Sequence, residues 1–243
     1  MSTITVQAVI DKTQVILQDT TGIRWPDNEL LDWLNDGQRE IVLYKPNAFI
    51  KNVAVKLVAG TKQGLPADGV QLIDVVRNMG TGGSSPGRAI RITMREVLDA
   101  QLPDWHLETA SSTVKHYMYS LLDPKNYYVY PPQPGAGQGY VEIVYGASPT
   151  DAVIGGTITL DDIYQNVLVD YILYRAYSKD AEYAADQTRA GQHQQAYIAA
   201  LAGKTQVEVG VNPNSMAPAN PNITPNSRES TGALKNGRFF QLS

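Results

Sequence analysis

The 243-residue chain contains no cysteine, which excludes disulfides and thiolate metal sites and leaves its redox compartment open. It also lacks a basic excess. Its formal net charge of −4 gives no electrostatic reason for tight binding to nucleic acid or to an anionic membrane. No run reaches the roughly 18 apolar residues of a membrane span, and the N-terminal segment has neither the basic start nor the apolar core of a signal peptide. We therefore expect a globular protein that is made and used in a cytosol-like compartment, without membrane attachment.

Two amphipathic helices are predicted in the N-terminal part of the chain. Between Thr5 and Gln18, apolar residues recur at steps of three and four, which is the stripe of a half-buried helix. The next stretch, residues 24–46, reads RWPDNELLDWLNDGQREIVLYKP. Pro26 suits the first turn of its helix and Pro46 stops the run. The two elements predict a helical hairpin.

The pattern changes at Phe49, where FIKNVAVKLVAG alternates apolar and polar residues with the period of a strand. Similar short runs recur as RAIRITM, VKHYMYSLL, NYYVYPP and GYVEIVYGA, separated by segments rich in glycine, proline and serine. Residues 49–158 are therefore predicted to form a small antiparallel β domain. A short helix is expected within it at REVLDAQL, Arg95–Leu102.

Helical periodicity returns at Thr159, which is predicted to cap a largely buried helix reading LDDIYQNVLVDYILYRAYSKD. A second helix follows, and Gly203 is expected to end it. The predicted fold class is α+β: a four-helix bundle formed by residues 1–48 and 159–203, with the β domain inserted at its middle and an extended C-terminal tail.

The tail, residues 204–243, has no sustained periodicity and is rich in asparagine, proline, serine and glycine. Such a composition does not bury enough apolar surface to offset chain entropy, so the tail alone should be disordered. It nevertheless ends in an apolar anchor with one cation, which predicts docking on a partner through Arg238, Phe239, Phe240 and Leu242. Residues 212–226 would act as an extended strap. The alternative is an ordinary frayed terminus.

Few residues suggest catalysis or metal binding. His106, His116 and His193 lie in three different elements without HExxH spacing, so structural roles are favoured for them. The glycine-rich run GTGGSSPG, residues 80–87, lacks the GK[ST] ending of a phosphate-binding loop and is interpreted as a flexible hairpin tip. GAGQG, residues 135–139, fails for the same reason. No catalytic residue, cofactor or metal site is predicted.

Asp32 and Asp36 are four residues apart and share one face of the second predicted helix, a geometry suited to holding a cation. Arg39 and Glu40 beside them favour a solvated or subunit-facing surface instead. A glycine within a helix costs about 1 kcal/mol, so Gly37 is interpreted as the point where a neighbouring helix comes close, including one from the next subunit. Gly37, Asp32 and Asp36 are therefore predicted to lie at a packing contact of this helix.

A resemblance to a known family rests on longer runs. They are the entry from Trp25 to Asn35 (WPDNELLDWLN), the closing KPN at residues 45–47, LYRAYSKDAEY at residues 173–183, the R-A-x-x-H-x-x-A-Y pattern of residues 189–197, and YVYPP. Together these runs resemble the bacteriophage head-tail adaptor (connector) proteins of the portal-tail junction. The tail-tubular-A type of short-tailed phages is the broader relative.

The resemblance implies a structural protein of the virion, not an enzyme, that forms a ring of roughly twelve copies between the portal and the tail. The helical bundle would build the ring and line a channel for DNA, which passes without specific binding. The β insert would point outward or toward a tail tube or nozzle protein, and the C-terminal tail would dock on the portal protein. Assembly would take place in the host cytoplasm.

Alternatives remain open. The nearest is a neck or tail-completion protein that never contacts the portal. From a different class, a tail-associated glycan hydrolase would use Asp104 and Glu108 in LPDWHLET as acid and base. A DNA-binding module is disfavoured by the charge balance and by the lack of a helix rich in arginine and lysine.

Overall fold

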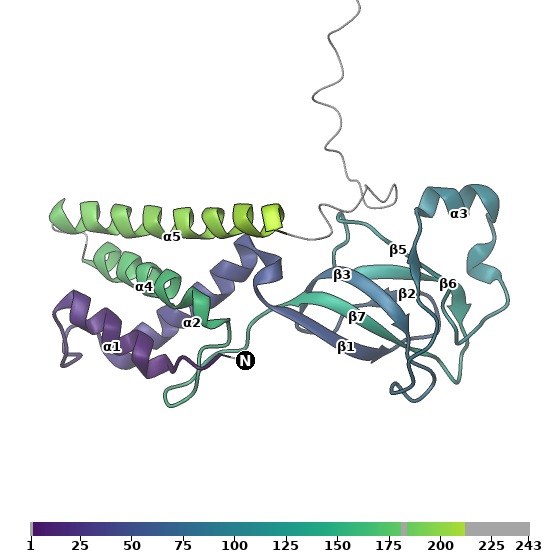
Figure 1. The fold of residues 1–243 in the computed structure, drawn as a ribbon, viewed down its shortest axis with the longest axis horizontal. Helices are drawn as coiled ribbons and strands as arrows, with labels where there is room; N and C mark the ends of the chain where they lie inside the picture. The colour runs from purple at the N-terminus through teal and green to yellow at the C-terminus, as the bar shows by residue number, and fades with distance from the viewer. Residues whose placement is uncertain (1, 181–183, 212–243) are drawn as a thin grey trace, which may run out of the picture. The chain divides into compact units, whose positions relative to one another are not determined.

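The structure, a computed structural model, describes residues 2–180 and 184–211, and the elements up to Gln206 form one compact unit. Five α-helices and seven strands follow in the order α1, α2, β1, β2, β3, β4, α3, β5, β6, β7, α4, α5 (Figure 1). The predicted α+β class is confirmed. Among the described residues, no helix combines the length and the apolar character that a membrane crossing requires.

The first two helices lie close to their predicted positions. α1, Val6–Leu17, begins at Thr5, whose hydroxyl accepts a hydrogen bond from the Ala8 amide at 3.2 Å. It ends at Gln18, which takes the left-handed conformation with φ of 58°. α2 spans Asp27–Tyr44, and Pro26 stands just before its first residue instead of inside the first turn. An extended proline at this position starts the helix without losing an amide that the helix needs.

The last two helices differ more from the prediction. α4, Gln165–Lys179, follows a short 3-10 helix, Asp162–Tyr164, which is capped by the Asp161 side chain. The prediction that Thr159 caps this region is wrong, because its hydroxyl donates to the Thr150 carbonyl at 2.7 Å.

α5 spans Ala184–Val211, so the prediction that Gly203 ends it is also wrong. Glycine ends a helix efficiently by adopting a positive φ, and Gly203 is not among the glycines with that conformation. As an interior helix residue, glycine costs only about 1 kcal/mol, which does not by itself stop a helix.

The helices α1, α2, α4 and α5 contribute to one hydrophobic core. Its fully enclosed members include Ile10, Leu34, Ile41, Leu168 and Ile172. α5 joins this core through only a few positions among its described side chains, chiefly Ala190, Tyr197 and Leu201. The narrow contact leaves most of the described surface of α5 open.

Two sheets form the inserted β region. β7, Tyr140–Ala147, is the centre of a three-stranded sheet between β1, Ile50–Lys56, and β3, Gly69–Asn78. The second sheet has the order β2-β6-β5-β4, with bounds Gly60–Gly64, Asn126–Gln133, His116–Tyr119 and Arg91–Ile92. All pairs are antiparallel except β4 with β5, so the predicted purely antiparallel domain needs correction at this edge.

The prediction missed β2 and β3, although β3 is ten residues long. Its pairing with β7 shifts register three times, between Gly69 and Gln71, between Leu72 and Asp74, and between Val75 and Arg77. Each such bulge inserts a residue and breaks the alternation of buried and exposed side chains. The period of two that signals a strand is therefore absent from this sequence.

The two sheets enclose a second core, which contains Leu72, Val75, Tyr127, Val129 and Ile143. The predicted short helix is confirmed as α3, Arg95–Gln101. With the 3-10 turn Trp105–Leu107 that follows, it covers Met118 in a small third core, where Trp105 is fully buried. The insert therefore has a core of its own.

The N-terminal residues are tied to the start of the second helical segment through Asp162. Its carboxylate accepts hydrogen bonds from the Ser2 and Thr3 hydroxyls, both at 2.5 Å, and from the Thr3 amide at 2.8 Å. These hydrogen bonds, chiefly those from Ser2 and Thr3, hold the pKa of Asp162 well below its ordinary value. Hydrogen bonds to the ionised form stabilise the charged carboxylate in the folded state.

We expect Asp162→Asn to destabilise the protein at neutral pH and to do so less in acid. The pKa of Asp162 is lower in the folded state than in the unfolded state. Its carboxylate therefore stabilises the fold fully above the unfolded-state pKa, and this stabilisation is lost as the pH falls toward the folded-state pKa. Urea unfolding at pH 7 and at about pH 3 measures this difference. Asp104→Asn, on an exposed loop, is the control. An equal loss at both pH values would contradict the role of the carboxylate.

Candidate functional site

The stretch 24–46 carries a site that joins α2 to the chain returning from the β insert. Leu30, Leu34 and Ile41 of α2 are fully buried, as the apolar periodicity predicts. Two amides on the same helix, Asn35 and Gln38, are also buried, with 8% and 1% of their surface exposed. A buried amide is costly unless its hydrogen-bonding groups find partners.

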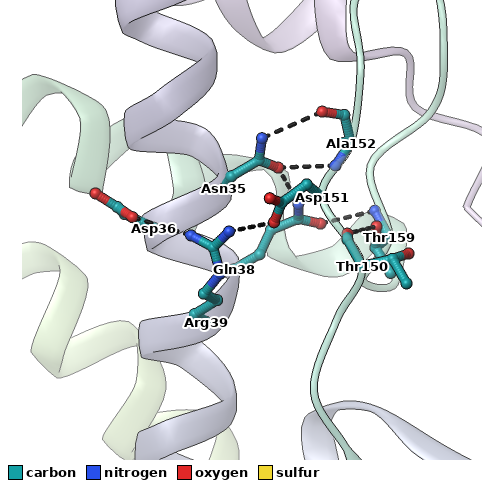
Figure 2. Close-up of polar contacts among 8 residues, drawn as sticks. All are labelled: Asn35, Asp36, Gln38, Arg39, Thr150, Asp151, Ala152 and Thr159. Carbon is teal, nitrogen blue, oxygen red and sulfur yellow. Dashed lines mark hydrogen bonds and ion pairs between the residues drawn. The ribbon is translucent and has the colours of Figure 1, made fainter. Parts of the chain in front are cut away.

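Asn35 satisfies both halves of its amide with one backbone residue. Its Nδ2 donates to the Ala152 carbonyl at 3.1 Å, and its Oδ1 accepts from the Ala152 amide at 2.8 Å (Figure 2). This paired contact resembles the exchange of hydrogen bonds between two strands. It fixes residue 152, which lies on the connection from β7 to α4, directly against the middle of α2.

Gln38 holds the same connection further along. Its Oε1 accepts hydrogen bonds from the amides of Thr159, at 2.7 Å, and of Leu160, at 3.2 Å. Its Nε2 donates to Asn35 Oδ1 at 3.2 Å, so the two side chains form one network (Figure 2). We call the contacts of Asn35 and Gln38 with residues 152, 159 and 160 the amide clamp.

A charged group borders the amide clamp at the surface. Arg39 pairs with Asp36 at 3.1 Å and also with Asp151 on the returning connection (Figure 2). The three side chains are 46%, 47% and 60% exposed, so solvent and salt screen these pairs strongly. The clamp therefore depends mainly on the buried amides and little on the ions.

Gly37 lies on the buried side of α2, against α4 of the same chain. A Cβ atom built at Gly37 would stand 2.8 Å from Tyr171 Cδ1 and 3.2 Å from Leu168 Cδ2. A neighbouring helix does come close at this glycine, and within the described chain that helix is α4. Burial raises the pKa of the Tyr171 hydroxyl, which marks the low polarity of this contact.

Asp32 and Asp36 do not form a joint site in the described structure. Asp32 is exposed, while Asp36 pairs with Arg39. No group of three or more histidine, cysteine, aspartate or glutamate side chains suited to a metal ion occurs among residues 2–180 and 184–211. The predicted tail residues Arg238, Phe239, Phe240 and Leu242 lie outside the described residues.

The three histidines occupy separate packed positions. His106 stacks on Trp105 with ring centroids 3.6 Å apart and bonds to the Thr61 hydroxyl at 2.8 Å. His193 is half-buried instead of lying freely on the helix surface, with Nδ1 3.0 Å from Asp170 Oδ1. His116 lies in β5 as predicted, stacked on Tyr130. The structure brings none of the three together.

Asp104 and Glu108, the acid and base of the hydrolase alternative, are both exposed. Glu108 accepts a hydrogen bond from Tyr130 at 3.3 Å. Asp104 precedes the turn Trp105–Leu107 without a side-chain capping bond. Neither carboxylate lies in an enclosed setting of the kind that a glycosidase acid occupies.

The two glycine-rich runs are connections. GTGGSSPG leads from β3 into the bridge between Arg77 and Ala89, and the Gly87 amide donates to the Asn78 carbonyl at 2.8 Å, so the predicted hairpin tip is confirmed. GAGQG joins β6 to β7, which belong to different sheets. Both runs change the direction of the chain.

Sequence reasoning missed the amide clamp. Gln38 occupies a position in the apolar stripe between Leu34 and Ile41, and a polar residue there is the available signal that a partner is buried with it. Its partners are backbone groups of residues 152, 159 and 160, which no residue type announces. The sequence therefore allows the side-chain half of the clamp to be suspected but not its backbone partners.

The chain is an α+β protein in which a two-sheet insert interrupts a helical core, and two buried amides of α2 hold the connection that returns from the insert. The sequence model of the SU10 adaptor protein family matches residues 4–221, and the chain belongs to this family. It is thus a phage structural adaptor, a virion component that interacts with other virion proteins. No curated protein matches the chain.

Proposed function

We propose that this adaptor forms a ring between the portal and the tail of the virion. The family match over residues 4–221 is the observation that carries the proposal, because it spans both helical segments and the insert. An adaptor that joins two rings must itself close by a repeated contact between unlike faces of neighbouring copies. A ring of roughly twelve copies is the expected assembly.

In this proposal the helical segments act as a four-helix bundle that builds the ring. The shared core of α1, α2, α4 and α5 supports it, since all four bury side chains in one cluster. The divisions at 1–48, 49–158 and 159–203 then separate the bundle halves from the insert. Gly37, Asp32 and Asp36 are proposed to contribute to ring packing, Gly37 by fixing α4 against α2 and the two aspartates at the surface.

DNA is proposed to pass through the ring without specific binding. The chain's net charge of −4 supports this, because a channel that attracted phosphates would slow the movement of DNA.

Residues 212–243, the part of the predicted tail that follows α5, are proposed to dock on the portal protein, with Arg238, Phe239, Phe240 and Leu242 as the anchor. Their composition supports coupled folding on a partner, in which an extended segment covers a large surface. The β insert is proposed to face a tail tube or nozzle protein. The mechanism is assembly on the portal vertex, without catalysis or cofactor.

The test is a truncation that ends at Val211. We expect the shortened protein to keep the helical circular dichroism of the full chain but to lose binding to purified portal rings of the same phage, scored by electron microscopy. A second variant, Phe239→Ser with Phe240→Ser, changes the anchor and leaves the strap, residues 212–226, intact, so it tests the anchor alone. Portal rings fully decorated by the truncated protein would refute portal docking by this segment. A full chain that decorates tail proteins but never portals would favour the neck assignment.

A further inference from the structure

Three cations gather at the β4 end of the second sheet. Arg88 leads into β4, Arg91 lies in β4, and Lys115 precedes β5, to which β4 is paired. Arg91 and His116 are register partners, and the charges of all three cations act on the His116 ring. Burial is nevertheless the main cause that lowers the pKa of His116. The cluster is therefore a local group, although Lys115 is distant in sequence from the two arginines.

These cations are exposed, and none of them forms an ion pair with the described part of the chain. Neighbouring arginines behave differently, since Arg77 pairs with Glu142 and Arg95 with Asp99. Neither residues 75–95 nor residues 109–122 contain an aspartate or glutamate. In a chain with net charge −4, these three cations are unpaired among the described residues, and Asp74, Glu96, Glu108 and Asp123 flank the two segments in the sequence.

Exposed apolar side chains lie close to the cations along the chain. Ile92 follows Arg91 in β4, Met94 precedes the first residue of α3, and Val97 lies three residues further on that helix. Their exposed fractions are 39%, 63% and 44%. An apolar centre bordered by arginine, with methionine in it, is the composition of a protein interface. We call Arg88, Arg91, Lys115, Ile92, Met94 and Val97 the β4 edge surface.

We propose that the β4 edge surface binds an acidic, partly apolar segment of another virion protein. The occupant follows from charge: three unpaired cations favour carboxylates, and the exposed Ile92, Met94 and Val97 favour apolar side chains beside them. A DNA backbone satisfies the cations but leaves the apolar residues uncovered. The inference rests on the proposed function as an adaptor, and it names a surface that the proposed portal docking does not use.

The probe is a fluorescein-labelled peptide of six glutamates interspersed with three leucines, titrated with the full-length protein and followed by anisotropy. We expect saturable binding that weakens as salt is added. Replacing Arg88, Arg91 and Lys115 together by glutamine should weaken it by about tenfold, since each exposed pair contributes modestly. The matched control replaces the exposed Lys56, Lys62 and Lys125 by glutamine, with the same change of net charge, and should change affinity less than about twofold.

A second pair of variants tests the apolar part. Met94→Ser with Val97→Ser should weaken the peptide by about fivefold, whereas Val58→Ser with Leu122→Ser, also exposed, should leave binding unchanged. The proposal is overturned if the control set weakens peptide binding as much as the set Arg88, Arg91 and Lys115. It is also overturned if a DNA duplex binds through Arg88, Arg91 and Lys115 more tightly than the peptide does. In both cases the same variants should still bind portal rings. Failure of the proposed β4 edge surface is therefore distinct from failure of the adaptor assignment.

Discussion

Replacing Asn35 with alanine is expected to lower the free energy of unfolding by about 3 kcal/mol, because it leaves two buried backbone groups of Ala152 without partners. The Ala152 amide and carbonyl both bond to the Asn35 side chain, and Ala152 itself is 7% exposed. An unsatisfied buried donor or acceptor costs about 1–3 kcal/mol. Gln38 also loses the acceptor for its Nε2, which weakens the rest of the amide clamp.

The matched control is Asn28→Ala, at an exposed position of the same helix. Both substitutions replace asparagine by alanine in α2, so a loss at Asn35 well above the loss at Asn28 measures the clamp. Urea unfolding followed by circular dichroism measures both. If Asn35→Ala costs no more than Asn28→Ala, the connection after β7 is held by other contacts and the clamp has no structural role.

The helical part could be predicted from sequence because its signals are local. Apolar spacing located α1 and α2, and Thr5 and Pro46 marked their ends. The prediction was wrong where one residue type has several uses. Thr159 has the side chain of a cap but donates instead to a carbonyl, and Gly203 has the freedom to end a helix but stays helical. Which use prevails depends on neighbours that are distant in sequence.

The β insert could be predicted less well, since its strands depend on pairing. β1, β6 and β7 alternate in the sequence and were found, whereas the bulges of β3 remove the alternation. The parallel pairing of β4 with β5 is also invisible in sequence, because β4 has only two residues. Sheet order arises from contacts between segments that no local pattern specifies.

The candidate site shows the same limit. The stretch 24–46 was recognised as distinctive, and the family match includes it. Its buried hydrogen-bond network is formed by Asn35 and Gln38, whose amides contact backbone groups more than 100 residues away in the chain. Ring packing through Asp32 and Asp36 stays a prediction. Family resemblance therefore pointed to the right helix, while the residues that join it to the insert required the three-dimensional structure.

Gly37→Leu is expected to lower the free energy of unfolding by about 3 kcal/mol, the upper part of the range for overpacked cores. Leucine is a good helix former, so backbone propensity alone would favour the variant by close to 1 kcal/mol. Against this, even a Cβ atom would approach the Tyr171 ring to 2.8 Å. That ring is 6% exposed and packs against Tyr197 with centroids 5.3 Å apart, so it has little room to move away.

Gly191→Leu is the control, because no atom lies within 4 Å of a Cβ at this helical glycine, and it should be neutral or slightly stabilising. Unfolding is measured at a concentration where the protein is monomeric by sedimentation. A stability loss in the monomer assigns the close approach at Gly37 to α4 of the same chain, and any defect in ring assembly is then secondary. If the monomer of Gly37→Leu is as stable as the wild type and only assembly fails, a helix of the neighbouring subunit must occupy the space beside Gly37 instead.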